Sequence, residues 1–225
     1  AVWSGNQLAS IPNQDAMSKD HAYDQLLPVT KWGKRFIVPL TGMHTQYNEI
    51  HVSGLQDNTS VRVTNIDGTR NWSMSAQDDS VLVLQGPLGG TLDGLDTYIE
   101  SDKPIQVYLY SSAGAANPYN DANRKRHLQG DPAMTIIPPL EYLTDSTIFQ
   151  TYNGGDGGMA HEMRLWARTS DVNSIRLDGN AIGSSFSPMS YASGYSIAKI
   201  SLGHGTHIIT APKKSFSGYV YGMND

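Results

Sequence analysis

The second half of the chain repeats the order of short apolar segments found in the first half. Residues 49–68 read EIHVSGLQDNTSVRVTNIDG, and residues 162–179 repeat this pattern as EMRLWARTSDVNSIRLDG. Residues 80–112 and 196–223 match in the same way, and both stretches end on a tyrosine-rich run after a lysine-containing turn. Self-similarity at a fixed spacing predicts two bodies of about 110 residues in tandem.

Each body has the sequence pattern of a β-sheet protein. Short alternating or β-branched runs recur roughly every 8–12 residues with turn residues between them, and helical periodicity is almost absent. The candidate strands of the first body are 35–40, 49–54, 60–65, 80–85 and 105–111. Asp-Gly pairs at 67–68 and 178–179 favour tight hairpins, because they tolerate positive φ. We expect an all-β chain of two tandem β-sandwich-like repeats, with a β-propeller fragment as the alternative.

The opening of the chain resembles the end of the first body. Residues 1–12 read AVWSGNQLASIP and align with VYLYSSAGAANP at 107–118, which makes them a further copy of the closing strand. An apolar strand without its own sheet exposes backbone groups that recruit another strand. We therefore expect the chain to be part of a longer array, with an assembly strand that pairs with the next body or a neighbouring molecule. This strand comprises Ala1, Val2, Trp3, Ser4 and Gly5.

The repeats suggest a division of the chain into four parts. Residues 1–24 are interpreted as the closing strand of a preceding repeat plus a loop, and 25–113 as the first β repeat. Residues 114–134 form a connecting loop in this interpretation, and 135–225 form the second β repeat.

Composition excludes several classes of protein. The net charge of -5 provides no basic stripe for a phosphate backbone, so we expect no nucleic-acid partner. No apolar run reaches the roughly 18–20 residues that span a bilayer, so we expect no membrane span. The absence of cysteine excludes disulfides and thiolate metal sites. Only 16% of residues are charged, a composition that favours an extracellular β protein.

Several polar and aromatic side chains are candidates for binding. Tyrosines alternate along the two closing strands, so each pair is expected on one face of a sheet, where it could stack a sugar ring or contact a protein. Carboxylate and imidazole groups precede both proline-marked strands and could bind a metal or a proton, or tie their loops to the backbone. The tyrosines are Tyr108, Tyr110, Tyr219 and Tyr221, and the polar residues are Asp20, His21, His127 and Asp131.

No motif of an enzyme family is present, and we expect neither a catalytic residue nor a resident cofactor. Oxygen-rich segments at 119–127 and 153–158 leave calcium as a candidate ligand, although Lys125 falls where an oxygen ligand is needed. Two N-x-S/T tripeptides make Asn58 and Asn71 candidate glycosylation sites in a eukaryotic secretory pathway.

Many short blocks in order resemble the N-terminal domain family of the IgGFc-binding protein. The matching residues in the first body are Val2, Ser4, Gly5, Asp20, His21, Gln25, Leu26, Pro28, Val29, Trp32, Gly33, Phe36 and Val38. Later blocks are GDPAM at 130–134, IIPPLE at 136–141, LDG at 177–179, GHGTHIITA at 203–211 and YVYG at 219–222. Animal mucus members carry cysteines where this chain has Leu8 and Lys19, so the chain is similar to a cysteine-free, bacterial-like or non-vertebrate variant.

The resemblance implies a non-enzymatic module, secreted or at the cell surface, that serves adhesion or extracellular assembly within a larger repeat protein. The implied partners are a protein or glycan at a cell surface or in the extracellular matrix, and further copies of the module. The alternative is a glycan-binding or glycan-active domain, for which hydrolysis needs paired carboxylates about 5–10 Å apart. Immunoglobulin Fc binding is a third option.

Overall fold

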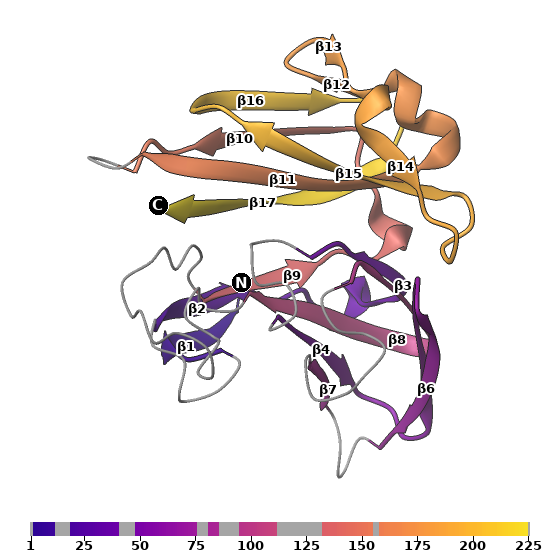
Figure 1. The fold of residues 1–225 in the computed structure, drawn as a ribbon. Helices are drawn as coiled ribbons and strands as arrows, with labels where there is room; N and C mark the ends of the chain where they lie inside the picture. Colours follow the sequence, from indigo (N-terminus) through magenta and orange to yellow (C-terminus); the bar gives the residue numbers. More distant parts are fainter. Residues whose placement is uncertain are drawn as a thin grey trace. The chain divides into compact units, whose positions relative to one another are not determined.

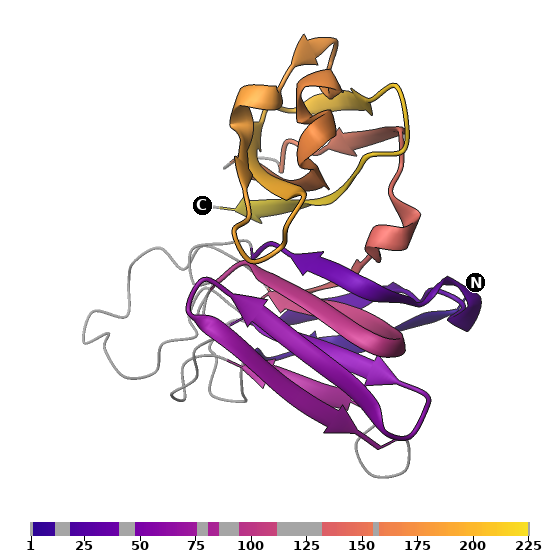
Figure 2. The same ribbon diagram turned by 90° about the vertical axis from the view of Figure 1, so that its right-hand side faces the viewer.

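The computed structural model describes residues 2–11, 19–40, 48–75, 81–85, 95–111, 132–154 and 158–224. The chain divides into two compact units, unit 1 (Ala1–Pro139) and unit 2 (Leu140–Asp225). Antiparallel strands and short 3-10 helices form both units (Figure 1; Figure 2). The predicted all-β, sandwich-like fold class is confirmed.

Unit 1 is built around one long central strand, β8 (Thr97–Ser111). Residues 97–101 of β8 pair with β3 and β5, and residues 105–111 pair with β4 and β9, while Gly33 of β3 also lies opposite Ile105. Ile99, Ile105, Val107 and Leu109 of β8 are fully buried between the two halves of this sheet system. The other elements are β1 (Trp3–Ala9), β2 (Asp20–Gln25), η1 (Val29–Lys31), β3 (Gly33–Val38), β4 (Glu49–Gly54), β5 (Thr59–Asn65), β6 (Gly68–Met74), β7 (Val81–Gln85) and β9 (Ala133–Ile137).

Unit 2 consists of two four-stranded sheets, ordered β10-β16-β12-β13 and β14-β15-β11-β17. Both sheets contribute to one apolar core, which includes Leu165, Ile209 and Phe216. Two sheets that share one core form a sandwich and not a pair of propeller blades. The elements are η3 (Leu140–Tyr142), β10 (Ser146–Thr151), β11 (Met159–Arg168), η5 (Thr169–Ser174), β12 (Arg176–Leu177), β13 (Asn180–Ala181), η6 (Gly183–Ser185), β14 (Phe186–Pro188), β15 (Tyr195–Leu202), β16 (Gly205–Thr210) and β17 (Phe216–Asn224).

Strand pairing follows the same order in the two units. The ladders β3–β8, β5–β6 and β4–β7 of unit 1 correspond to β10–β16, β12–β13 and β11–β15 of unit 2. The second half of β8 pairs with β4 as β17 pairs with β11. Unit 2 therefore contains the two halves of β8 as separate strands, β16 and β17.

The register of the β4–β8 and β11–β17 ladders agrees with the sequence alignment. Glu49 lies opposite Tyr110 in unit 1, and Glu162, its counterpart, lies opposite Tyr221 in unit 2. Likewise Gly33 lies opposite Ile105, whereas an isolated bridge joins Thr144 to Phe216. Because side chains alternate along a strand, an equal register also places equivalent side chains on equivalent faces.

The opening strand β1 has its partner within unit 1, because it forms a two-stranded sheet with β2. Trp3 lies opposite Gln25, and the backbone N–H of Leu26 donates to the carbonyl of Val2 at 2.8 Å. This register is the one that pairs Tyr108 with Ile136 in the β8–β9 ladder. The β1–β2 hairpin thus shares the residue register of the β8–β9 pair but bonds through the opposite edge of its closing strand, because Leu26 N–H donates to Val2 whereas Ile136 N–H donates to Asp24. All of strand β2 except Gln25 lies within residues 1–24, where the sequence interpretation expected a loop after the closing strand.

The inner face of the hairpin packs against β8 and β9. Ala9, Ala22 and Met134 form a buried apolar cluster, which Tyr108 and Tyr110 flank with partly buried rings. The carboxylate of Asp24 accepts the backbone N–H of Ile136 at 2.9 Å, which ties β2 to β9.

The boundary between the units lies at residues 139 and 140, not at 134 and 135 as the sequence interpretation placed it. The reason is β9, which adds to β8 and so belongs to unit 1. The connecting loop of that interpretation, 114–134, lies outside the described residues except for its last three positions.

The two predicted hairpins form with different turns. Asp178 and Gly179 both have positive φ, 51° and 81°, as the Asp-Gly prediction requires. In the β5–β6 hairpin the turn is one residue earlier, at Ile66-Asp67, because the side chain of Asn65 accepts the backbone N–H groups of Asp67 and Gly68.

Candidate functional site

The outer face of the β1–β2 hairpin exposes large apolar side chains. Trp3 and Tyr23 are each 61% exposed, and their rings meet edge to face with centroids 6.2 Å apart. Gly5 lies opposite Tyr23, and a Cβ at this position would overlap the Tyr23 side chain. Leu8 is also 61% exposed. These three side chains, Trp3, Leu8 and Tyr23, form what we call the hairpin patch. Val2 is 64% exposed, but it precedes Trp3 in the ladder and so points to the opposite face.

The register explains why the hairpin exposes apolar side chains. In the alignment Trp3 corresponds to Leu109, which is fully buried in the core of unit 1. The face that carries Trp3 is therefore the core face of a closing strand, here without a second sheet over it among the described residues. Exposed apolar clusters of this kind mark interaction sites.

A hollow of about 360 Å³ lies on the other side of the hairpin, between β1, β4 and β8. Its polar groups come from Ser4 and Asn6 of β1, from Glu49 and His51 of β4, and from Tyr110 of β8. Apolar contacts from Ala9, Ile11 and Ala22 line the remaining wall.

One acid and one base lie side by side in this hollow. The Nε2 atom of His51 is 2.8 Å from Oε2 of the buried Glu49, and the His51 ring lies 4.5 Å from the Tyr110 ring. Burial raises the pKa of the Tyr110 hydroxyl, and the neighbouring Tyr108 and Glu49 raise it further. Burial also raises the pKa of Tyr108. Both phenols therefore stay protonated at neutral pH and can donate hydrogen bonds.

The hollow offers hydrogen-bond donors and acceptors beside an aromatic ring, a chemistry that suits a polar ligand. Among its described lining residues Glu49 is the one carboxylate, whereas glycoside hydrolysis usually uses two.

The predicted Asp20-His21 pair lies at the start of β2. The Nδ1 atom of His21 is 2.8 Å from Oδ1 of Asp20, and both side chains are largely exposed. The backbone N–H of His21 also donates to this carboxylate, and the two hydrogen bonds lower the pKa of Asp20. The pair is separate from the residues that line the hollow. His127, Asp131 and Ala1 lie outside the described residues.

The four predicted tyrosines belong to two different units. Tyr108 and Tyr110 lie on β8 beneath the hairpin, as described above. Tyr219 on β17 packs its ring 6.2 Å from the ring of Trp166, and Tyr221 is buried. Tyr110 therefore contacts the His51 ring in unit 1, and Tyr219 contacts the Trp166 ring in unit 2.

Both candidate glycosylation sites are exposed. Asn58 has a φ of 53° in the turn before β5, and its carbonyl accepts Lys103 Nζ at 3.2 Å. Asn71 lies on β6 opposite Arg62. Their use stays a prediction.

The first candidate calcium segment, 119–127, and part of the second, 153–158, lie outside the described residues. Across the described ranges no group of three or more His, Asp or Glu side chains is arranged to hold a metal ion. In the same residues no helix has the length and apolar character needed to cross a membrane.

Sequence reasoning missed Glu49, His51 and Tyr23. The first two had a signal, because acidic and basic residues two apart on a predicted strand share a face. Tyr23 had none, since its position depends on the ladder between β1 and the polar segment β2.

The chain matches the family model described as IgGFc binding protein over residues 1–222. It is 24% identical over 212 residues to the human IgGFc-binding protein, an alignment that covers 94% of this chain and 4% of the human protein. No solved structure matches the chain. Because the family model spans nearly the whole sequence and both units, the chain belongs to the IgGFc-binding protein family.

Proposed function

We propose that the chain is a non-enzymatic, extracellular protein-binding module that adheres to protein partners through the hairpin patch. The observation that carries this proposal is the exposure of Trp3 and Tyr23 on a face that is core elsewhere in the fold. Tryptophan and tyrosine are the side chains that most often dominate the binding energy of protein interfaces. Family membership and the low fraction of charged residues support an extracellular location.

The test is a binding assay with immobilised extracellular proteins, namely IgG Fc fragment, fibronectin and collagen. We expect the wild-type chain to bind at least one of them, and Trp3→Ala or Tyr23→Ala to weaken this binding by roughly tenfold or more. Ile66→Ala is the matched control, because Ile66 is 65% exposed at the tip of the β5–β6 hairpin, away from the patch. Equal loss in all three variants, or binding that ignores Trp3 and Tyr23, would argue against the patch.

Glycan binding is a second candidate function, and the hollow beside Tyr110 supports it. A glycan array read with the wild-type chain and with Tyr110→Leu tests it, because the leucine keeps an apolar side chain but removes the hydroxyl and the aromatic ring. Loss of a glycan signal in the variant, with protein binding retained, would favour glycan recognition in the hollow.

A further inference from the structure

The edge of β17 carries backbone groups that point away from its one strand partner. Among the described strands β17 pairs only with β11. The N–H and C=O of Phe216 turn away from β11 and bond to Thr144. Because successive residues of an antiparallel strand point alternately to either side, the backbone groups of Gly218, Val220 and Gly222 also point outward. Their N–H and C=O groups form an unoccupied edge template, since no other described segment bonds to them.

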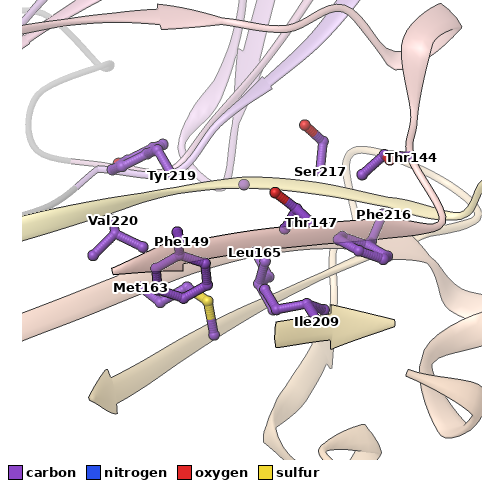
Figure 3. A pocket seen from close by; sticks show the side chains of 11 residues that line it. Thr144, Thr147, Phe149, Met163, Leu165, Ile209, Phe216, Ser217, Tyr219 and Val220 are labelled. Carbon is purple, nitrogen blue, oxygen red and sulfur yellow. The ribbon is translucent and has the colours of Figure 1, made fainter. Parts of the chain in front are cut away.

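An apolar pocket of about 350 Å³ opens between the two sheets of unit 2 beside this edge (Figure 3). Val220, Phe149 and Met163 lie on one side of β17 in Figure 3, whereas Ser217 and Tyr219 point to the other side. The apolar lining consists of Phe149, Met163, Leu165, Ile209, Phe216 and Val220.

In unit 1 the edge of β8 that is equivalent to the open edge of β17 is covered by a strand. There β9 pairs with the outer edge of β8, and Ile137, opposite Val107, is fully buried. Phe36 of β3 is fully buried as well, whereas Thr147, its counterpart on β10, is exposed. The same two-sheet framework is thus covered by a strand in unit 1 and open in unit 2.

The β8–β9 ladder identifies which strand suits the edge of β17. Strand β17 is a copy of the second half of β8, and residues 25–27 are the counterparts of residues 135–137 of β9. Transferring the β8–β9 register, in which Ile137 lies opposite Val107, to β17 places Leu27 opposite Gly218, beside the apolar pocket. The same register places Tyr23 opposite Gly222.

We propose that the edge of β17 accepts strand β2 of a second copy of this chain, as the outer edge of β8 accepts β9. Leu27 of the incoming copy fills the pocket next to Val220. The outward backbone groups of β17 bond to the incoming β2, which becomes the fifth strand of this sheet. The contact is heterologous, so successive copies join head to tail. This inference rests on the proposed protein-binding role. The accepting edge of β17 is separate from the hairpin patch, whereas the incoming β2 carries Tyr23 of that patch.

The absence of cysteine permits a direct test by disulfide trapping in the full chain. The transferred register puts Val220 opposite Gln25, in an outward-pointing pair whose Cα atoms are about 5.5 Å apart, a separation that a disulfide spans. Equimolar Val220→Cys and Gln25→Cys chains, mixed under mild oxidation, should yield a covalent heterodimer. The control pairs Val220→Cys with Ile66→Cys, because Ile66 is also exposed, and it should cross-link at least roughly tenfold less.

A peptide test reports on the same edge without opening the hairpin. Fluorescein-labelled peptide Asp20–Pro28 should bind the wild-type chain and protect the amides of Gly218, Val220 and Gly222 from hydrogen exchange. Val220→Pro removes one outward N–H without touching the β11 ladder and should weaken binding at least tenfold, whereas Ile148→Ala should not change it. A peptide with Leu27→Asp should also fail.

Two results would overturn the inference. One is equal cross-linking of Val220→Cys with both partner chains, which indicates random collision. The other is absence of amide protection on β17 at millimolar peptide concentration. A chain that fails these tests but still loses partner binding in Trp3→Ala would keep the proposed function and lose only this inference.

Discussion

The two units carry equivalent closing strands with different surroundings. In unit 1 the outer edge of β8 is covered by β9, and the side chains beneath it, Phe36 and Ile137, are fully buried. In unit 2 the corresponding edge of β17 has no strand over it among the described residues, and the space beneath it is a pocket. The comparison teaches that in unit 1 the strand after the closing strand completes the core.

The largest expected effect concerns the covering strand. Ile137→Ala removes a fully buried side chain and leaves a cavity beside Val107, so we expect a loss of about 3 kcal/mol in the free energy of unfolding of unit 1. Urea denaturation measures it. Ile148→Ala in unit 2 is the control, since Ile148 is 68% exposed and its truncation should cost under about 0.5 kcal/mol. Equal losses of unfolding free energy in Ile137→Ala and Ile148→Ala would contradict the role of β9 as the strand that covers the core of unit 1.

A second test concerns the equivalent glutamates. Oε1 of Glu162 accepts Arg164 Nε at 2.7 Å, and Oε2 lies 2.6 Å from Lys199 Nζ. In unit 1, Oε2 of Glu49 lies 2.8 Å from His51 Nε2. Glu162→Gln leaves a largely buried arginine without its anion and should cost about 2 kcal/mol. Glu49→Gln should cost about 1 kcal/mol. Denaturation of both variants at neutral pH measures the difference, and a larger loss in Glu49→Gln would contradict the comparison.

The hairpin turns give a smaller effect. Asn65→Ala removes the side chain that accepts the N–H groups of Asp67 and Gly68, so we expect a loss of about 1 kcal/mol. In unit 2 the turn depends on backbone conformation, and Gly179→Ala, at a φ of 81°, should cost a similar amount. Unchanged unfolding midpoints would show that the flanking ladders alone define these turns.

The smallest expected effect on stability comes from the ionisation of His207 and Asp178 in unit 2. His207 Nδ1 lies 2.7 Å from Oδ2 of Asp178, and this hydrogen bond raises the pKa of His207 and lowers that of Asp178, while Thr97 occupies the corresponding place in unit 1. The histidine contribution to stability is full below its unfolded pKa near 6.5 and is lost as pH rises through the folded value. The aspartate contribution is present above 3.8 and is lost as pH falls.

NMR titration of the His207 ring protons measures this directly. We expect a midpoint above that of an unstructured histidine, and a lower midpoint in Asp178→Asn. A midpoint unaffected by Asp178→Asn would show that the ion pair does not form in solution.

The duplication made much of the fold predictable. Because Glu49 and Glu162 begin equivalent segments, aligning them also aligned their opposite tyrosines, and the ladders follow that register. The strand β2 was not predictable, because Asp20, Tyr23 and Gln25 form no apolar run, and its strand conformation depends on long-range pairing with β1. Ile137 was assigned to the wrong side of the boundary, since only its ladder with β8 shows which core it completes.

The candidate site was less accessible from sequence than the fold. The tyrosines of β8 were identified, but the hollow beside them needs β1 to fold back across β4, a long-range contact with no local signal. The exposure of Trp3 was also not predictable, because an apolar closing strand is buried in one context and exposed in another.

The undivided length of β8 has a consequence for how the two units open. With 15 residues at about 3.4 Å each, β8 runs for roughly 50 Å through both halves of unit 1, so loss of one half releases an end of the other. Such coupling predicts that the amides of unit 1 exchange together, as one cooperative foldon. In unit 2, residues 211–215 separate β16 from β17. Each sheet can therefore open locally without breaking the ladder hydrogen bonds of the other sheet.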